Sequence, residues 1–550
     1  MAEQAEIRSG AGIVGAATLI MAGNATSRLL GLVREQVIAA LFGRTGITDA
    51  YVAAITVPTM LYDLVVGGAV SAALIPVFSD YAGAADRRDL RQVAGTMLTL
   101  TALILALAVA ALWLFAEQLM GVLGVGLAEE NRALAVALVR LGLPAVVFLG
   151  LSGVMTALLY ARQVFTYPAF CTAAYNASII AAALLLATQL SAASLVVGVL
   201  AGAAFQVAIQ APGLRGLGLW PRLDLRHPGV RRILLLYGPV ALGLVVSQVG
   251  VVIDRNLASR AGEGAMAAMR FATTLVQLPL GLVVTAAAYA ILPTLSRFAA
   301  AADKAGAARG GAPITLPGGA TAADAAAAYR DTLALGLRFS LFFVLPAMVG
   351  LIALREPLVG LLFQRGLFGA ADTSQTAWIL LFYLPQLPFV AVDQLLVVAL
   401  YARKNTLTPM LVGVLGVGVY LVVGLSLLGP MRAAGLALAN TLQNSVHSLV
   451  LLALLAREVE GLCGRQLWGQ LGRIALPAAL TGIVLAAIAG PAAIVFDLAS
   501  PWGQLAYLLA ATCLGGAVYL LAARALGSEE LALAVGVARK VAGRARVRPA

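Results

Sequence analysis

Long apolar runs, separated by short polar or Gly/Pro-containing breaks, follow one another along almost the whole chain. Each run is about 20 residues long, which is enough for a helix to cross the hydrocarbon core of a bilayer. The alternating pattern of a transmembrane strand does not occur. We therefore predict an all-α polytopic membrane protein with about 14 transmembrane helices.

An internal repeat divides the predicted helices into two six-helix lobes. The segment LYARQVFTYP at 159–168 returns as LYARKNTLTP at 400–409, and LIPVFSDYA at 74–82 returns as ILPTLSRFA at 291–299. Both pairs are separated by an even number of predicted helices, so the two halves would have the same orientation. Transporters built from such repeats place the substrate between the halves, near the bilayer midplane.

The breaks between runs predict the domain boundaries. We predict an N-terminal lobe at 1–212, a cytoplasmic linker at 213–228, a C-terminal lobe at 229–456, two extra helices at 457–526 and a basic cytoplasmic tail at 527–550. Residues 298–328, rich in Ala and Gly, are predicted to form a mobile cytoplasmic loop.

Composition and charge distribution support a membrane protein. The 550 residues are 61% hydrophobic and 11% charged, whereas soluble domains carry about 25% charged residues. About 25 of the 37 Lys and Arg residues lie on one predicted side of the membrane, which places both termini in the cytoplasm. We interpret the net charge of +12 as a topology or lipid-headgroup signal, with no nucleic-acid partner.

Neither terminal processing nor a disulfide framework is expected. Glu3 and Glu6 precede the first apolar run, and no small-residue cleavage site follows it, so we expect a retained helix instead of a signal peptide. Cys171, Cys463 and Cys513 lie far apart, and we interpret them as small apolar residues.

Charged residues occur inside the first predicted helix. Asn24, Arg28 and Glu35 are spaced close to one helical face, and Arg34 lies about a third of a turn away. A charge at the centre of a bilayer costs roughly 2.5–3.5 kcal/mol, so such residues normally face a cavity or a partner. Spacing alone leaves an internal salt bridge and a ligand contact equally open.

The C-terminal half carries a similar polar stripe. Arg270, Thr273, Thr274 and Gln277 follow i, i+3, i+4 and i+7, and Arg255 lies on the preceding helix. Guanidinium presents a planar fork to phosphate oxygens, so an arginine-lined cavity suits a phosphate-bearing substrate.

Two acids are candidates for coupling to a monovalent cation or a proton. These are Asp254 and Asp393, although an ion pair between Asp254 and Arg255 is at least as consistent with the sequence. A further polar stripe, which we interpret as interhelical hydrogen bonding, comprises Asn440, Gln443, Asn444 and His447.

The chain has little that points to catalysis. It has no Walker loop, nucleophile elbow or thiolate pair, and its two histidines belong to no metal-ligand cluster. We therefore expect a transporter and no enzyme, with no metal or cofactor. Its direction of transport would come from a coupling cation, a proton gradient or the membrane potential.

Five segments are distinctive: SRLLGLVREQVIAALFGRTGITDAY at 27–51, VVSQVGVVIDRNLAS at 245–259, LVQLPLG at 275–281 followed by ILPTLS at 291–296, LLFQRGLF at 361–368 followed by Asp372–Thr373, and LYARKNTLTP at 400–409. They resemble signatures of the MurJ/MviN lipid II flippases, a family of the multidrug/oligosaccharidyl-lipid/polysaccharide exporter superfamily. The resemblance implies two lobes in a pseudo-twofold arrangement around a central cavity, and two C-terminal helices that form a lipid-tail groove. The implied cargo is lipid II, an undecaprenyl-diphosphate-linked saccharide of the bacterial plasma membrane.

The resemblance also implies roles for individual residues. Ser27, Arg28, Arg34 and Asp49 match cavity positions of the family, and Glu35 stands where the family has an aspartate. Asp254 matches an acid that is present in some members of the family and is associated there with cation binding.

The chain departs from the family at three places. Tyr62–Asp63 and Gly67–Gly68 replace an arginine pair and a Glu-Gly. Thr274 replaces an arginine, and Arg270 lies one turn earlier on the same face.

Our leading hypothesis is a flippase that moves lipid II from the inner to the outer leaflet by alternating access, with flexure near Pro58 and Pro279. The predicted substrate-binding residues are Ser27, Arg28, Arg34, Glu35, Asp49, Arg255, Arg270, Thr274 and Gln277. The alternatives are a flippase for another lipid-linked oligosaccharide, a cation-coupled drug exporter, or a non-transporting scaffold for cell-wall synthesis enzymes. The arginines disfavour the exporter because its cargo is usually cationic.

Overall fold

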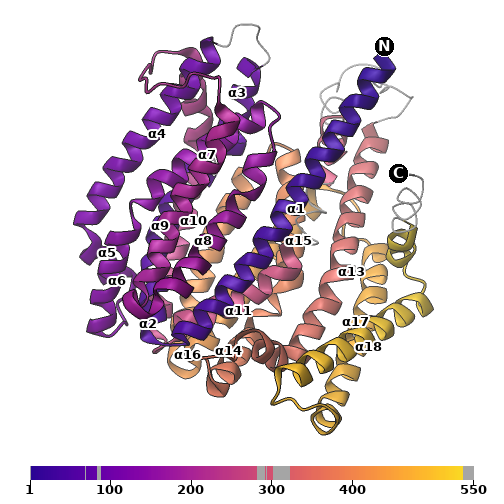
Figure 1. Cartoon of the computed structure of the whole chain (residues 1–550). Coiled ribbons are helices and arrows are strands. Elements are labelled where there is room, and N and C mark those ends of the chain that lie inside the picture. Colours follow the sequence, from indigo (N-terminus) through magenta and orange to yellow (C-terminus); the bar gives the residue numbers. More distant parts are fainter. Residues whose placement is uncertain are drawn as a thin grey trace. The chain divides into compact units, whose positions relative to one another are not determined.

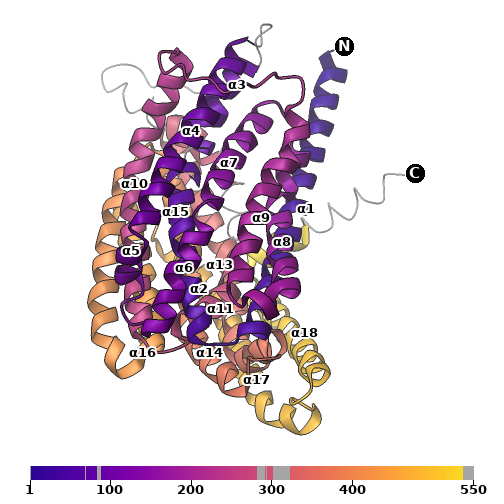
Figure 2. The same ribbon diagram turned by 60° about the vertical axis from the view of Figure 1, so that its left-hand side comes forward.

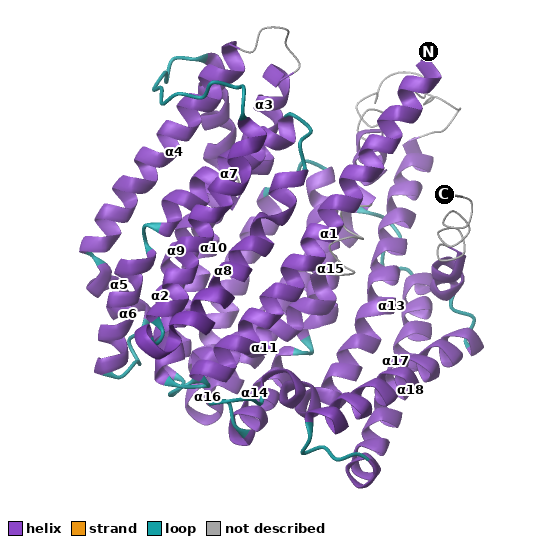
Figure 3. Cartoon of the chain, viewed as in Figure 1, coloured by secondary structure: helices purple, strands orange, loops and turns teal. Residues whose placement is uncertain are grey.

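The computed structural model of the chain describes residues 2–67, 70–82, 88–281, 291–292, 294–301 and 322–536. Within these ranges the backbone consists of helices, loops and turns, without a strand (Figure 3). The prediction of an all-α membrane protein is therefore confirmed. Seven described helices are long and apolar enough to cross a membrane, or ten if each of three bent pairs is one span. The count of about 14 stays a prediction.

Some of the predicted features lie outside the described residues. These are most of the loop at 298–328, the end of the tail at 527–550, and Pro293 in the second repeated segment.

The chain forms two compact units. One comprises Met1–Ala268 and Phe363–Asp372, and the other comprises Met269–Leu362 and Thr373–Ala550. The lobe boundaries that we expected from the sequence stay a prediction.

The first unit is built around one long helix and its neighbours. α1 (Ala2–Phe42) lies along α8 (Thr166–Leu190), which pairs with α9 (Ala193–Gln210), as Figure 1 shows. α7 (Ala145–Ala161) contacts both α9 and α4 (Arg88–Leu114). The other elements of this unit are α2 (Gly46–Tyr62), α3 (Ile75–Ala82), α5 (Ala116–Leu123), α6 (Glu129–Gly142), a 3₁₀ turn at Ala211–Leu214 and α10 (Pro228–Arg260).

Two glycines explain the close pairing of α8 and α9, which run side by side in Figure 2. A Cβ atom at Gly198 would lie 2.6 Å from the Cα atom of Ile179, and one at Gly202 would lie 3.0 Å from the carbonyl oxygen of Tyr175. Small residues at this spacing allow two helix backbones to approach in a membrane, where packing replaces the hydrophobic effect as the driving force.

An irregular stretch joins α2 to α3. Pro58 lies inside α2, and two π-helical turns, Asp63–Gly67 and Val70–Leu74, follow it. A π-helical turn inserts an additional residue into a helix and is frequent at functional sites. Tyr62 and Asp63, which depart from the family pattern, are therefore located where the helix is irregular.

The second unit has a core shared by three helices. α13 (Ala322–Phe363), α15 (Gln386–Ala402) and α16 (Leu407–Glu458) contribute Leu333, Leu395 and Leu451 to it. α17 (Arg465–Val495) and α18 (Pro501–Ala525) pack on α13 through Ile474, Tyr519 and Phe342. Two helices, α11 (Ala265–Pro279) and α14 (Ala370–Tyr383), begin in the first unit and continue into the second.

The repeat predicted from the sequence is present in the helix breaks. α6 and α7 form a pair bent by 42° before Ala145, and α14 and α15 form a pair bent by 44° before Gln386. Pro144 and Pro385 are the N-caps of the second helix in each pair. Proline lacks a backbone N–H and starts a helix readily, so both breaks have the same cause.

The turns that follow these helices also match. Gln163 has φ 58° and Lys404 has φ 59°, a left-handed conformation that usually favours glycine. The N–H of Val164 donates to the Leu159 carbonyl at 2.9 Å, and the N–H of Asn405 donates to the Leu400 carbonyl at 2.9 Å.

A third break recurs at the same spacing. Ser191, between α8 and α9, has φ 48° and ψ −136°. Arg432 has φ 50° and ψ −129° and divides α16 into a first segment, 407–431, and a second segment, 433–458. In all three pairs the second position follows the first by 241 residues (404 minus 163, for example). The internal repeat is therefore confirmed between these segments.

Candidate functional site

A buried polar cluster joins α1 to α8 in the first unit. Arg34 pairs with the adjacent Glu35, with 2.6 Å between Nη2 and Oε1, and donates to Oδ1 of Asn176 at 2.9 Å. The amide nitrogen of Asn176 donates to the backbone carbonyl of Ser27 at 3.1 Å. Glu35 is 1% exposed and Asn176 is 4% exposed, so the contacts replace water as hydrogen-bond partners.

Arg28 differs from Arg34 although both lie on α1. Its side chain is exposed, and it makes no hydrogen bond or ion pair within the described part of the chain. An arginine in an apolar helix that has no protein partner is available to a ligand or a lipid headgroup. Of the predicted arginines on α1, Arg28 is therefore the one with a free guanidinium.

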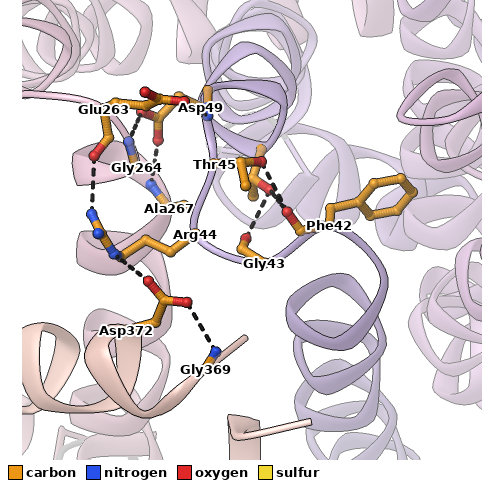
Figure 4. A network of polar contacts seen from close by, with 12 residues as sticks. Phe42, Gly43, Arg44, Thr45, Asp49, Glu263, Gly264, Ala267, Gly369 and Asp372 are labelled. Atoms are coloured by element: carbon orange, nitrogen blue, oxygen red, sulfur yellow. Dashed lines mark hydrogen bonds and ion pairs between the residues drawn. The ribbon is translucent and has the colours of Figure 1, made fainter. Parts of the chain in front are cut away.

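Asp49 belongs to a different network, at the junction of α1 and α2 (Figure 4). Its carboxylate accepts from the backbone N–H groups of Gly264 at 2.7 Å and Ala267 at 2.8 Å. These groups lie at the start of α11, where free N–H groups and the helix dipole favour a negative charge. Asp49 is 1% exposed, so the structure places it as a cap for α11.

Arg44 extends the network of Asp49. It pairs with Asp372, with 2.9 Å between Nε and Oδ1, and donates to the carbonyl of Glu263 at 2.9 Å. Gly264 has φ +71°, and a Cβ atom there would lie 2.4 Å from the carbonyl oxygen of Arg44. A glycine is therefore required at this position. The segment Phe363–Asp372 thereby joins the first unit by an ion pair (Figure 4).

On α10 the structure places Asp254 beside Arg255. Nη1 of Arg255 lies 3.6 Å from Oδ2 of Asp254, and both side chains are about one-quarter exposed. The ion pair that the sequence left open is therefore present. Coupling of Asp254 to a cation stays a prediction.

α11 carries the polar stripe of Arg270, Thr274 and Gln277. The hydroxyls of Thr273 and Thr274 donate to the carbonyl of Arg270, at 3.0 and 2.9 Å. Such bonds satisfy a threonine hydroxyl within its own helix. Arg270 is partly exposed and Gln277 is exposed, so their side chains reach the surface of the second unit.

Two of the four polar residues predicted to form interhelical hydrogen bonds on α16 do so, Asn444 and His447. Asn444 donates to Oε1 of Gln386 on α15 at 2.8 Å. Nδ1 of His447 lies 2.6 Å from Oδ1 of Asp393, also on α15. Asp393 is therefore one half of a partly buried Asp–His pair, in which the His447 and Asp393 side chains are 17% and 24% exposed.

The structure brings together three groups of predicted site residues: Ser27 with Arg34 and Glu35, Asp254 with Arg255, and Arg270 with Thr274. Asn176 and Arg44 are polar partners that we did not predict. Asn176 had a signal, because it is a single amide within a long apolar run. Arg44 had no such signal, because its partner Asp372 is 328 residues away.

Comparison with known proteins places the chain in a family. The family model "Lipid II flippase MurJ" matches residues 38–500. The chain is 29% identical to "Lipid II flippase MurJ" of Burkholderia cenocepacia, over 77% of this chain and 80% of that protein. It is 31% identical to "Probable lipid II flippase MurJ" of Vibrio cholerae, over 73% and 74%.

Solved structures share the fold. A structure titled "Lipid II flippase MurJ, inward closed conformation" covers 92% of this chain and 98% of its own, with a TM-score of 0.73 and 23% identity. A multidrug resistance MATE family transporter of the MOP superfamily has a TM-score of 0.62 and 13% identity, and covers 79% and 95%. The match to most of the chain shows that this multi-pass membrane protein belongs to the lipid II flippase MurJ family.

Proposed function

We propose that this protein is a flippase that moves lipid II from the inner to the outer leaflet of the bacterial plasma membrane. Its family membership supports the cargo, and the free guanidinium of Arg28 on an apolar helix carries the proposal at the level of residues. A diphosphate offers oxygen acceptors that match the guanidinium fork. The protein acts as a transporter, with both termini in the cytoplasm.

Arg28 would bind the diphosphate, whereas Arg34 would position α1 against α8. Arg34 and Glu35 neutralise each other at 2.6 Å, and Asn176 occupies a further donor of Arg34. Arg255 and Arg270 remain candidates for contacts with the head group, as do Thr274 and Gln277. Asp49 already accepts two backbone N–H groups, which supports a role in holding α11.

The decisive experiment replaces Arg28 in a bacterium depleted of its own flippase. We expect Arg28→Ala to abolish rescue of growth, and Arg28→Lys to restore part of it, because lysine keeps the charge without the fork. Leu29→Ala, at the exposed neighbouring position, is the matched control and should rescue fully. Full rescue by Arg28→Ala at normal expression would refute the assignment.

A flippase for another polyprenyl-diphosphate-linked saccharide is the second candidate. This candidate is favoured because the chain has Tyr62, Asp63 and Thr274 at positions where the family has arginine. A leaflet-specific assay in proteoliposomes distinguishes the two, since it compares lipid II with an exopolysaccharide unit on the same lipid. Faster flipping of the exopolysaccharide unit would support this second candidate.

The direction of lipid transport would be set by the membrane potential or by a coupling ion. A charge that crosses 100 mV gains roughly 2.3 kcal/mol. Asp254 and Asp393 are the acids proposed to bind a monovalent cation or a proton.

A further inference from the structure

His447 contacts two hydrogen-bond acceptors. Its Nδ1 lies 2.6 Å from the carboxylate of Asp393 on α15, and its Nε2 lies 3.3 Å from the backbone carbonyl of Pro409 on the first segment of α16. His447 itself lies on the second segment of α16. One imidazole ring therefore connects three helical segments of the second unit.

These contacts determine how many protons the pair holds. A neutral imidazole has a single N–H, and beside an ionised Asp393 that N–H belongs on Nδ1. The lone pair of Nε2 would then face the lone pairs of the Pro409 carbonyl, which is repulsive. Both contacts are favourable when the Asp393–His447 pair holds two protons, either as imidazolium with carboxylate or as imidazole with carboxylic acid. The geometry is that of a proton-loaded pair with no net charge.

The repeat provides an internal comparison. Ser152 and Gln206 of the first unit are the counterparts of Asp393 and His447 at the offset of 241 residues (393 minus 152, and 447 minus 206). The hydroxyl of Ser152 donates to Oε1 of Gln206 at 3.0 Å. The same interhelical contact is thus made by side chains that do not titrate in the first unit, and by a titratable pair in the second.

No other charged side chain of the described residues contacts the pair. The carboxylate of Asp393 forms its ion pair with His447. Tyr401 is a titratable group on the same helix. Arg403 is paired with Glu458 at 3.3 Å. The remaining charged or titratable groups on α15, on α16, in the turn between them and on the described segments packed against them include Arg297, Tyr329, Lys404, Tyr420 and Arg457.

We infer that Asp393 and His447 form a proton-binding site that couples flipping to the proton gradient. Release of one proton from Nε2 to water changes the charge of the pair from zero to −1, inside an apolar helical bundle. It also turns the Nε2 contact with Pro409 from attraction to repulsion, so the first segment of α16 loosens from the second. This inference deepens the proposed function, on which its transport step rests.

A spectroscopic test addresses the proton site without transport. The chain has two histidines, so His227→Asn leaves His447 as the only one. The imidazole of His227 accepts from the N–H of Gly229 at the start of α10, and the asparagine side chain can cap the helix in the same way. In nanodiscs at pH 7, nitrogen NMR of labelled histidine should show the pair holding both protons. Asp393→Asn should remove this signature. A neutral imidazole beside an ionised Asp393 throughout pH 5–8 would overturn the inference.

A transport test uses the first unit as the template. Asp393→Ser with His447→Gln rebuilds the Ser152–Gln206 contact in the second unit, so the helices stay joined without a titratable group. With the membrane potential clamped to zero, a pH difference should shift the leaflet distribution of lipid II in the parent protein by up to about tenfold per pH unit for one proton per cycle. The double variant should not respond.

The outcomes separate the two proposals. If the parent protein flips no lipid II under any gradient, the proposed function fails, and the NMR experiment still decides the proton site. If the double variant, shown to be folded by its thermal midpoint, responds to the pH difference like the parent, the coupling role is overturned.

Discussion

Arg28 and Glu35 are seven residues apart on nearly the same face of α1, yet their environments differ completely. Arg28 is exposed, whereas Glu35 is 1% exposed and paired with Arg34. The residues of the polar stripe seen in the sequence therefore do not form one common site. The neighbours of each turn of the helix, such as Asn176 on α8, decide which charges are neutralised within the protein.

At the scale of residues, we predict that Arg34→Ala destabilises the protein more than Arg34→Ala combined with Glu35→Gln. Removal of one partner of a buried pair typically costs about 3–5 kcal/mol, and the 22% exposure of the Arg34 side chain reduces that figure here. The double variant removes the uncompensated charge and should recover most of the loss. Thermal midpoints in nanodiscs measure the difference, and a double variant less stable than the single one would contradict the prediction.

At the scale of elements, the two halves share their breaks more closely than their side chains. Pro144 and Pro385, Gln163 and Lys404, and Ser191 and Arg432 occupy matching positions. The prolines and the LYAR segments were recognisable in the sequence. The left-handed residues were not, because glutamine, lysine, serine and arginine rarely adopt positive φ and only the surrounding helices impose it.

We predict that Lys404→Gly and Gln163→Gly each stabilise the protein. A non-glycine residue in the left-handed region costs roughly 1–2 kcal/mol, and glycine relieves this strain at the expense of a more flexible unfolded chain. The net gain should be about 0.5–1 kcal/mol at each position. Lys404→Ala and Gln163→Ala keep the strain and are the controls. Thermal or denaturant unfolding would show the order, and glycine variants no more stable than the alanine variants would argue against it.

At the scale of the whole molecule, the distribution of Lys and Arg predicts how the chain is oriented in the membrane. The positive-inside rule predicts that both termini and the linker at 213–228 lie in the cytoplasm. The helices themselves leave the orientation open, because a helix is equally apolar whichever end enters the membrane first.

We therefore predict opposite reporter activities on the two sides of the membrane. A fluorescent protein fused after residue 536 should be bright, and alkaline phosphatase fused there should be inactive, because it folds only outside the cytoplasm. Phosphatase inserted near Arg432, at the predicted outer end of two helices, should be active. Active phosphatase at both positions would contradict the predicted topology.

The sequence by itself determined the all-α membrane fold, the repeat and the family. The length of each apolar run and the distribution of charge can be read directly from the sequence, and the duplicated segments still have recognisably similar sequences. Tertiary structure alone decided which polar residues are neutralised and which are free. The partners of Asp49, Arg44, Asp393 and His447 are tens to hundreds of residues away, and hydrogen bonding depends on distances of a few ångströms that periodicity does not encode.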